Sequence, residues 1–107
     1  MNKDKTIEKR AGFTPGPWKV GDYENEELPI LDETGSYVAL ADSEFANNAK
    51  EAQANARLIA SAPELYEQCK LFERVIVELL MQGETGVDYE LEKLREVLAK
   101  ADGRAEA

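Results

Sequence analysis

The residues best suited to bind a ligand in this 107-residue chain are Trp18, Asn55 and Arg57. Trp18 follows a Pro-Gly-Pro turn, and an aromatic face held on rigid backbone stacks well on purines and cations. Asn55 and Arg57 project from an alanine-rich segment, where the arginine fork suits phosphate or carboxylate. Trp18 and Arg57 each have a structural alternative, because Trp18 can nucleate the core and Arg57 can bind a carbonyl or an acidic group of its own chain. The sequence leaves these alternatives open.

The residue types needed for most covalent or metal chemistry are missing. The chain has no histidine, which rules out a His-based zinc site and every Ser-His or Cys-His nucleophile. Its one cysteine, Cys69, cannot form an intrachain disulfide, fits a reducing compartment and falls on an apolar helical stripe, where packing is expected. A run of carboxylates lacks the regular spacing of a metal loop: Glu24, Glu26, Glu27, Asp32 and Glu33. We therefore expect no enzyme, no cofactor and no metal site.

Acidic residues outnumber basic residues 22 to 13, which gives a formal net charge of −9. Repulsion from phosphates makes direct binding to nucleic acid or to an anionic membrane unfavourable, so we expect a protein or a small molecule as the partner. An acidic surface also admits a second interpretation, in which the carboxylates imitate a DNA backbone. Residues 1–10 are charged, and no apolar run reaches the roughly twenty residues of a membrane span, which predicts a cytoplasmic protein.

The N-terminal residues predict a tail followed by an extended segment. Residues 1–12 have almost no apolar content to repay the entropy of ordering, so we expect a disordered tail there. Two prolines then bracket Gly16 and prevent a helix. We expect Trp18, which follows them, to lie in a strand and to share one face of it with Val20.

Two more strands are expected in a hairpin. The apolar run 28–31 is the first, and Pro29, which cannot donate a ladder hydrogen bond, favours an edge position or an early place in the strand. Residues 32–35 begin with Asp and end with Gly, as in a type I turn. Residues 36–41 alternate larger and smaller side chains and suit a strand paired with the first.

The next segment predicts one helix followed at once by another. The first runs from about residue 44 to residue 60 with Asp42 or Ser43 as its cap, and its many alanines permit close approach of another element. Ser61, followed three residues later by Glu64, has the pattern of a capping box, in which both side chains satisfy free N–H groups of the next helix.

The second helix, from residue 62 to about residue 82, carries apolar side chains over a wider arc than one neighbour needs. We expect this surface to contact both the sheet and another subunit, so the protein is predicted to be a homo-oligomer. Gly83 ends the helix, and Asp88 can cap a third one. The predicted interface residues are Phe72, Val75, Ile76, Leu79 and Leu80.

These elements together predict an α+β fold, with a small N-terminal antiparallel sheet of about three strands packed on two to three C-terminal helices. We expect residues 13–101 to form a single domain, with a frayed tail at 102–107.

Two segments, Thr14-Pro-Gly-Pro-Trp18 and the run Ala-Asn-Ala-Arg-Leu-Ile-Ala-Ser-Ala-Pro-Glu-Leu from Ala54 to Leu65, together resemble a family of small phage and prophage proteins. The resemblance covers roughly residues 13–80, and Ser61 stands where the family commonly has alanine. It implies a biological setting rather than a chemistry. The expected protein is a non-structural accessory protein of the cytoplasm of an infected or lysogenic bacterium.

Small phage proteins of this kind often act by binding. The resemblance and the lack of catalytic residues favour a non-enzymatic protein that modulates or antagonises a host or defence component. One alternative is a sponge for a nucleotide signalling molecule, with Trp18 stacked on the base and Arg57 on the phosphate. The other alternative is an acidic DNA mimic that inhibits a nucleic-acid enzyme.

Overall fold

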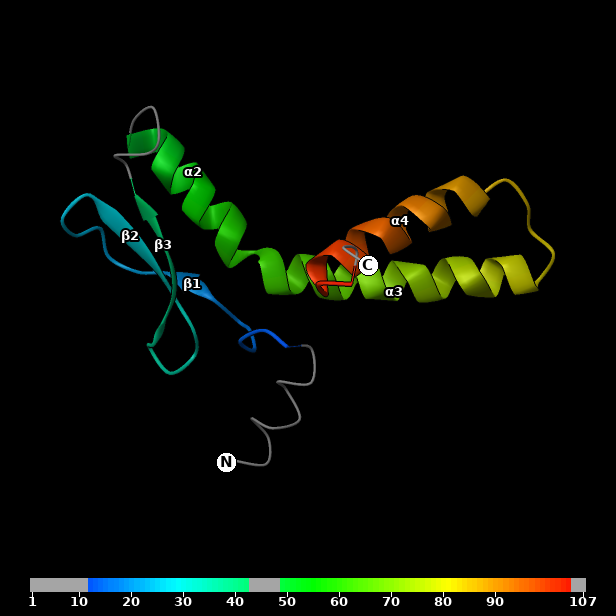
Figure 1. Cartoon of the computed structure of the whole chain (residues 1–107), viewed down its shortest axis with the longest axis horizontal. Coiled ribbons are helices and arrows are strands. Elements are labelled where there is room, and N and C mark those ends of the chain that lie inside the picture. Colours follow the sequence, from blue (N-terminus) through cyan, green and yellow to red (C-terminus); the bar gives the residue numbers. More distant parts are fainter. Residues whose placement is uncertain (1–11, 43–48, 105–107) are drawn as a thin grey trace. The chain divides into compact units, whose positions relative to one another are not determined.

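The computed structural model describes residues 12–42 and 49–104. The chain forms two compact units, residues 1–64 and 65–107. A three-stranded antiparallel sheet in the order β1-β2-β3 comes first, and three helices follow it, so the predicted α+β class is confirmed (Figure 1). The elements are β1 (Lys19–Val20), β2 (Glu27–Leu31), β3 (Tyr37–Asp42), α2 (Ala49–Ala60), α3 (Ala62–Met81) and α4 (Asp88–Ala101).

The strand β2 lies in the middle of the sheet, so the edge position, one of the two places expected for Pro29, is wrong; Pro29 is the third residue of β2. Pro29 pairs with Leu40 of β3, and on the other side its carbonyl accepts a hydrogen bond of 2.8 Å from the Gly21 N–H. The N–H that proline lacks would point to the same side as its carbonyl. On that side the short strand β1 has already ended at Val20, so the missing donor costs little.

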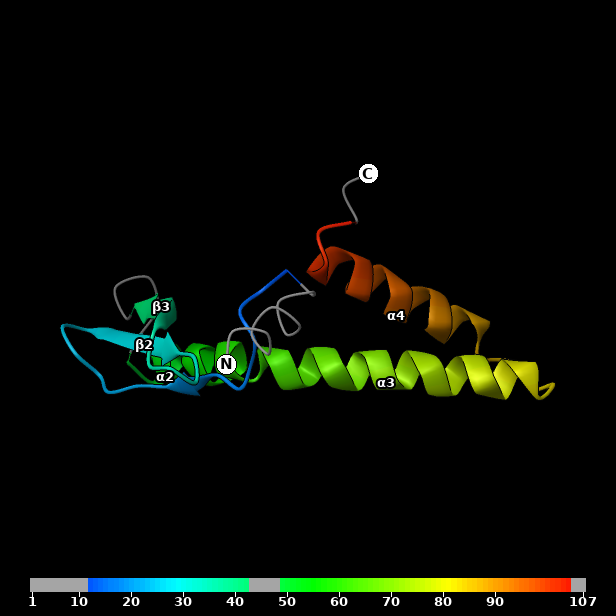
Figure 2. The ribbon, with the colours of Figure 1, turned by 90° about the horizontal axis from the view of Figure 1, so that it is seen from below.

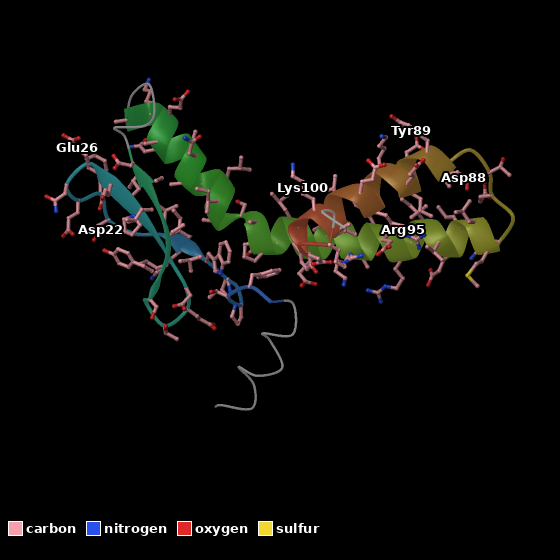
Figure 3. The ribbon with its side chains drawn as sticks, in the orientation of Figure 1. Asp22, Glu26, Asp88, Tyr89, Arg95 and Lys100 are labelled. Carbon is pink, nitrogen blue, oxygen red and sulfur yellow. The ribbon has the colours of Figure 1, made fainter. Side chains whose placement is uncertain are left out.

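The turn between β1 and β2 is tighter than a solvated loop. Glu24 and Glu27 exchange two backbone hydrogen bonds of 2.9 and 2.8 Å, which leaves Asn25 and Glu26 as the two central residues. Both have left-handed backbone, with φ of 51° and 64°. This is the conformation of a type I′ turn, whose twist matches that of the strands it joins. Glu26 therefore projects from the tip of the hairpin, as Figure 3 shows.

The turn predicted at residues 32–35 is formed. The Gly35 N–H donates to the Asp32 carbonyl at 3.0 Å, and Gly35 has a φ of 89°, which glycine adopts at no steric cost. One carboxylate oxygen of Asp32 accepts hydrogen bonds from the N–H groups of Thr34 and Ser36, at 2.8 and 3.0 Å. The side chain thereby fixes the connection from β2 to β3.

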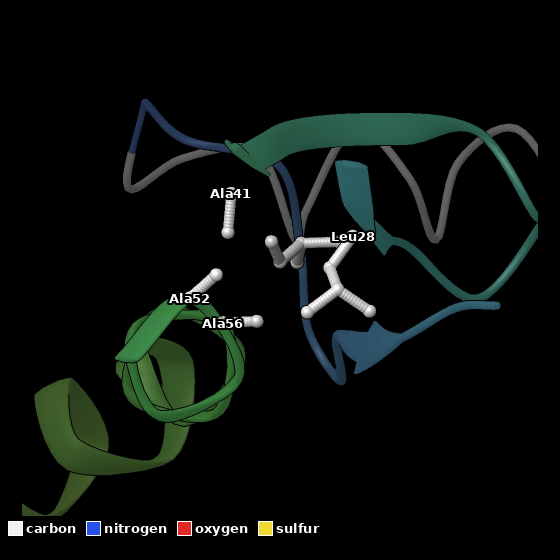
Figure 4. Packing of buried hydrophobic residues seen from close by; sticks show 5 residues of the cluster. Leu28, Ala41, Ala52 and Ala56 are labelled. Carbon is white, nitrogen blue, oxygen red and sulfur yellow. The ribbon is translucent and has the colours of Figure 1, made fainter. Parts of the chain in front are cut away.

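The core of the first unit lies between the sheet and α2. Leu28 and Ile30 alternate along β2 and point to the same face as Ala41 of β3, where they meet Ala52 and Ala56 of α2 (Figure 4). Ile30 and Ala56 are fully buried. Because the helix presents only methyl groups here, its backbone approaches the sheet closely, as the alanine-rich sequence predicted.

The helices α2 and α3 are separated by Ser61 alone. The Ser61 hydroxyl donates to the Arg57 carbonyl at 2.9 Å, and its N–H donates to the same carbonyl at 3.0 Å. Among the described residues, the side-chain hydrogen bond of Ser61 thus closes the last turn of α2, whereas the capping-box pattern predicted a bond to the start of α3. Most of the first helix is confirmed, and its predicted part at residues 44–48 lies outside the described residues.

The second unit is a helical hairpin in which α4 runs back along α3 in the opposite direction (Figures 1 and 2). Gly83, with a φ of 96°, ends α3 as predicted, and the following N–H of Glu84 returns to the Leu79 carbonyl at 3.1 Å. The N-cap of α4 is Val87, with no side-chain cap hydrogen bond, and Asp88 is the first helical residue. The cap assigned to Asp88 is therefore wrong; its carboxylate instead lies in the first turn, where the helix dipole favours it.

Candidate functional site

Trp18 is tied into the first unit by both its polar atom and its ring. The indole N–H donates to the carbonyls of Thr14 and Pro15, at 3.1 and 3.2 Å. The ring meets Phe13 edge to face at 6.4 Å between centroids, and it packs against the core cluster beneath α2. The side chain is half-buried, so the Pro-Gly-Pro turn and the indole hold each other in place.

The turn before Trp18 also touches the start of α3. A Cβ atom added to Gly16 would lie 2.7 Å from the Cβ of Pro63, which is closer than real side chains approach. Pro63 is buried. The two sequence segments that resemble phage proteins are therefore in direct contact, and Gly16 is the residue that permits it.

Asn55 and Arg57 occupy the exposed side of α2, on either side of the buried Ala56. Among the described residues, no hydrogen bond or ion pair joins Trp18, Asn55 and Arg57. Trp18 belongs to the border of the core, whereas the other two side chains face solvent. Their role in ligand binding stays a prediction.

Two polar contacts hold α4 to α3 in the second unit. The Arg95 Nε donates to a Glu73 carboxylate oxygen at 2.8 Å, and the Tyr66 hydroxyl donates to Asp102 at 2.7 Å. The two contacts are seven residues apart in each helix, so the antiparallel register is constant over two helical turns. Figure 3 shows Arg95 on the side of α4 that faces α3. Sequence reasoning missed both pairs, since no local pattern joins residues 36 and 22 positions apart.

The Tyr66–Asp102 contact shifts the ionisation of both groups. The hydrogen bond to Asp102 is the largest cause, followed by burial and by the charge of Asp102, and together they raise the pKa of Tyr66 to about 12. The same hydrogen bond, assisted by the one from Arg104, lowers the pKa of Asp102. Arg104 lies 2.8 Å from Asp102. Asp102 and Arg104 of the predicted frayed tail thus make these contacts, and residues 105–107 lie outside the described residues.

Apolar side chains are exposed along one side of the hairpin. Both α3 and α4 carry a half-buried apolar row, and the polar contacts lie on one side of each row. Most exposed apolar residues lie on the other side of each row, whereas Leu71 lines a hollow on the side of the polar contacts. Because the contacts join the helices on one side, these residues gather on the opposite side. They form what we call the hairpin face: Leu65, Phe72, Val75 and Leu79 of α3 and Val97 of α4. Their exposed fractions are 38–60% on α3 and 58% at Val97.

The predicted interface residues divide between two positions. Phe72, Val75 and Leu79 belong to the hairpin face. Ile76 and Leu80 lie in the half-buried row beside α4, with Cys69. No partner chain is present, so their role in an oligomer stays a prediction.

Two shallow hollows lie along the side of the hairpin that carries the Arg95–Glu73 pair. The larger, of about 530 Å³, is lined by acidic and basic groups in equal number together with two apolar residues: Glu67, Glu73, Glu78, Lys70, Arg74, Arg95, Leu71 and Val77. Balanced charges on an open surface do not favour one class of ligand. Neither of the hollows described contains Trp18, Asn55 or Arg57.

Among residues 12–42 and 49–104, no cluster of acidic or sulfur side chains is arranged to hold a metal ion. In the same described part of the chain, no helix is long and apolar enough to cross a membrane.

The family model of Salmonella phage P22 protein Y8K6 matches residues 1–105. The chain belongs to this family. The match confirms a phage protein family, as the resemblance implied, and it extends through α4, which the resemblance did not cover. No curated protein and no solved structure matches the chain significantly.

Proposed function

We propose that this member of the phage P22 Y8K6 family is a non-enzymatic accessory protein that acts by binding another protein, and thereby modulates or antagonises a host or defence component. Membership of a phage family supports the setting. The exposed apolar side chains of the hairpin face support the proposal that the protein binds a partner.

The hairpin face is unusual for a small water-exposed protein. Four large apolar side chains follow one another on α3 at spacings of seven, three and four residues, which keeps them on one stripe. Monomeric soluble proteins rarely expose contiguous apolar patches larger than a few hundred Å², and larger patches with a polar rim are typical of protein–protein contacts. A stripe on a helix is also one of the common ways in which proteins recognise one another.

The test is affinity capture of the tagged full chain from infected or lysogenic cells, followed by mass spectrometry of protein and small-molecule fractions. The double variant Phe72→Glu, Val75→Glu should lose the specific protein partner. Leu58→Glu is the matched control, because Leu58 is as exposed as Phe72, at 65% against 60%, but lies on α2. It should retain the partner.

Two results would contradict the proposal. Capture of a nucleotide, lost in Trp18→Ala and Arg57→Ala, would favour a small-molecule sponge. A protein partner captured equally by the wild type and the hairpin-face variant, and released by salt, would favour recognition through the acidic surface.

A further inference from the structure

The two units differ in how much of their apolar surface is buried. The buried apolar residues of the first unit come from two strands and a helix: Leu28, Ile30, Ala41, Ala52 and Ala56. Among residues 65–104 of the second unit, Leu98 is the only buried residue. A helix in a protein gains most of its stability from the packing of its apolar side, so α4 is held less firmly than α2.

The apolar contact between α3 and α4 is a narrow row. Cys69, Ile76 and Leu80 of α3 are half-buried, as are Leu91 and Leu94 of α4. Their spacings of three, four and seven residues keep them on one line along each helix. Separating the two helices therefore exposes less buried apolar surface than opening the core of the first unit would.

The polar contacts between the helices add only a modest hold. The Arg95–Glu73 pair lies at the surface, with side chains that are 55% and 29% exposed, and exposed ion pairs stabilise little. The hydrogen bond from Tyr66 to Asp102 lies at the C-terminal end of α4, close in sequence to Leu98. The best-held part of α4 is thus the end remote from its connection to α3.

The two helices also differ in length and in how they are attached. α4 has 14 residues, and an isolated helix of that length is marginal in water, so α4 unfolds when it leaves α3. α3 has 20 residues and begins at the buried Pro63, which lies against Gly16. In the connection between the helices, a Cβ atom added to Gly83 or Gly86 would meet no atom within 4 Å. Packing at these two positions therefore does not oppose movement of the connection.

We propose that α4 is a reversible cover of α3, which detaches and unfolds while the first unit stays folded. Detachment would expose Cys69, Ile76 and Leu80 and join them to the apolar stripe of the hairpin face on the same helix. The chain would then have a closed form, with a narrow exposed stripe, and an open form, with a wider one. This property belongs to the chain alone and does not depend on the proposed function.

Hydrogen exchange of the purified full chain, followed by mass spectrometry of its peptides, tests the proposal. Relative to intrinsic rates, the amides of α4 should exchange at least about tenfold faster than those of α2 and of the first half of α3. Leu98→Ala should accelerate the exchange of α4 by about thirtyfold or more, because it removes the buried side chain of the row. The exchange of α2 and β2 should not change.

Charge variants test whether α4 is released from α3 or merely frays. Arg95→Glu places a carboxylate beside Glu73 and should accelerate the exchange of α4 by about three- to tenfold. Adding Glu73→Arg restores opposite charges and should return the rate to near that of the wild type. Lys50→Glu makes the same change in net charge at an exposed position of α2, and should leave the exchange of α4 unchanged.

Three results would overturn the proposal. Protection of α4 equal to that of α2 would mean that no separate opening occurs, and equal protection of α3 and α4 would mean that the hairpin opens as one. Faster exchange of α2 in Leu98→Ala would mean that the first unit does not stay folded when α4 leaves. Each result is independent of whether a partner is captured, so failure of the cover and failure of the proposed function are distinguishable.

Discussion

Gly16 is the residue on which the contact between the Trp18 turn and α3 depends. We expect Gly16→Ala to destabilise the first unit by about 1–3 kcal/mol, because the new methyl group would lie 2.7 Å from the Pro63 Cβ and force a shift. Chemical denaturation of the purified protein measures this change. The cost should fall markedly when Gly16→Ala is made in a Pro63→Gly background, which removes the opposing ring. Equal costs in the two backgrounds would show that the close approach is not the cause.

The Tyr66–Asp102 pair should make stability depend on pH at both ends of the scale. The pKa of folded Tyr66, about 12, lies above its ordinary value of 10.0, so its contribution is present below pH 10 and is lost as the pH rises through about 12. The pKa of folded Asp102 is lowered, so its contribution is present above its ordinary value of 3.8 and is lost as the pH falls through the lowered pKa.

Unfolding free energies of the wild type and Tyr66→Phe, measured across this range, should differ most between pH 5 and 10 and converge as pH rises toward 12. Ultraviolet titration of tyrosinate checks the cause directly. Asp102→Asn keeps a carbonyl acceptor but removes the charge, so it should lower the pKa of Tyr66. An unchanged titration in this variant would argue against the contact.

At the scale of elements, the alanines of α2 set the distance between the helix and the sheet. Ala56→Leu should destabilise the first unit by about 1–3 kcal/mol, because the side chain has no space to occupy against Leu28 and Ile30. Ala54→Leu is the same change two residues away on the exposed side of α2, and it should alter the unfolding free energy by no more than about 0.5 kcal/mol. Thermal and urea denaturation of the two variants makes the comparison. Equal effects would mean that the change in helix propensity, and not packing, is responsible.

Local patterns in the sequence predicted most of these elements. The alternation in residues 36–41, the Asp-Gly turn at 32–35 and the glycine after α3 are each determined by neighbouring residues, and the structure has all three. The central place of Pro29 was not predictable in this way, since it depends on where a different strand ends.

The hairpin face, too, could be predicted only in part from the sequence. The apolar excess on α3 was visible in the sequence because a wide stripe needs only helical periodicity. Which part of it faces α4 was not, because Tyr66–Asp102 and Arg95–Glu73 form only after the hairpin closes. The exposed part of the stripe could therefore be separated from the half-buried row only in the folded structure.

For the whole molecule, the two units differ in how their cores are completed. The first unit encloses its core between the sheet and α2, with Ile30 and Ala56 fully buried. The second leaves the hairpin face exposed. The enclosed core therefore belongs to the first part of the sequence, and the exposed apolar stripe belongs to the second.

If the second unit completes its core by dimerisation, its stability must depend on protein concentration. Each tenfold rise in concentration should favour the folded dimer by up to about 1.4 kcal/mol, because unfolding then separates two chains. Circular dichroism melts of the helical signal over a roughly hundredfold concentration range should show a rising midpoint for the wild type and for Leu58→Glu. Phe72→Glu should lower the midpoint and remove its concentration dependence, since the charge would be buried in the dimer interface. A wild-type midpoint that is independent of concentration would mean that the hairpin is stable with its face open, and that its exposed stripe serves a partner other than itself.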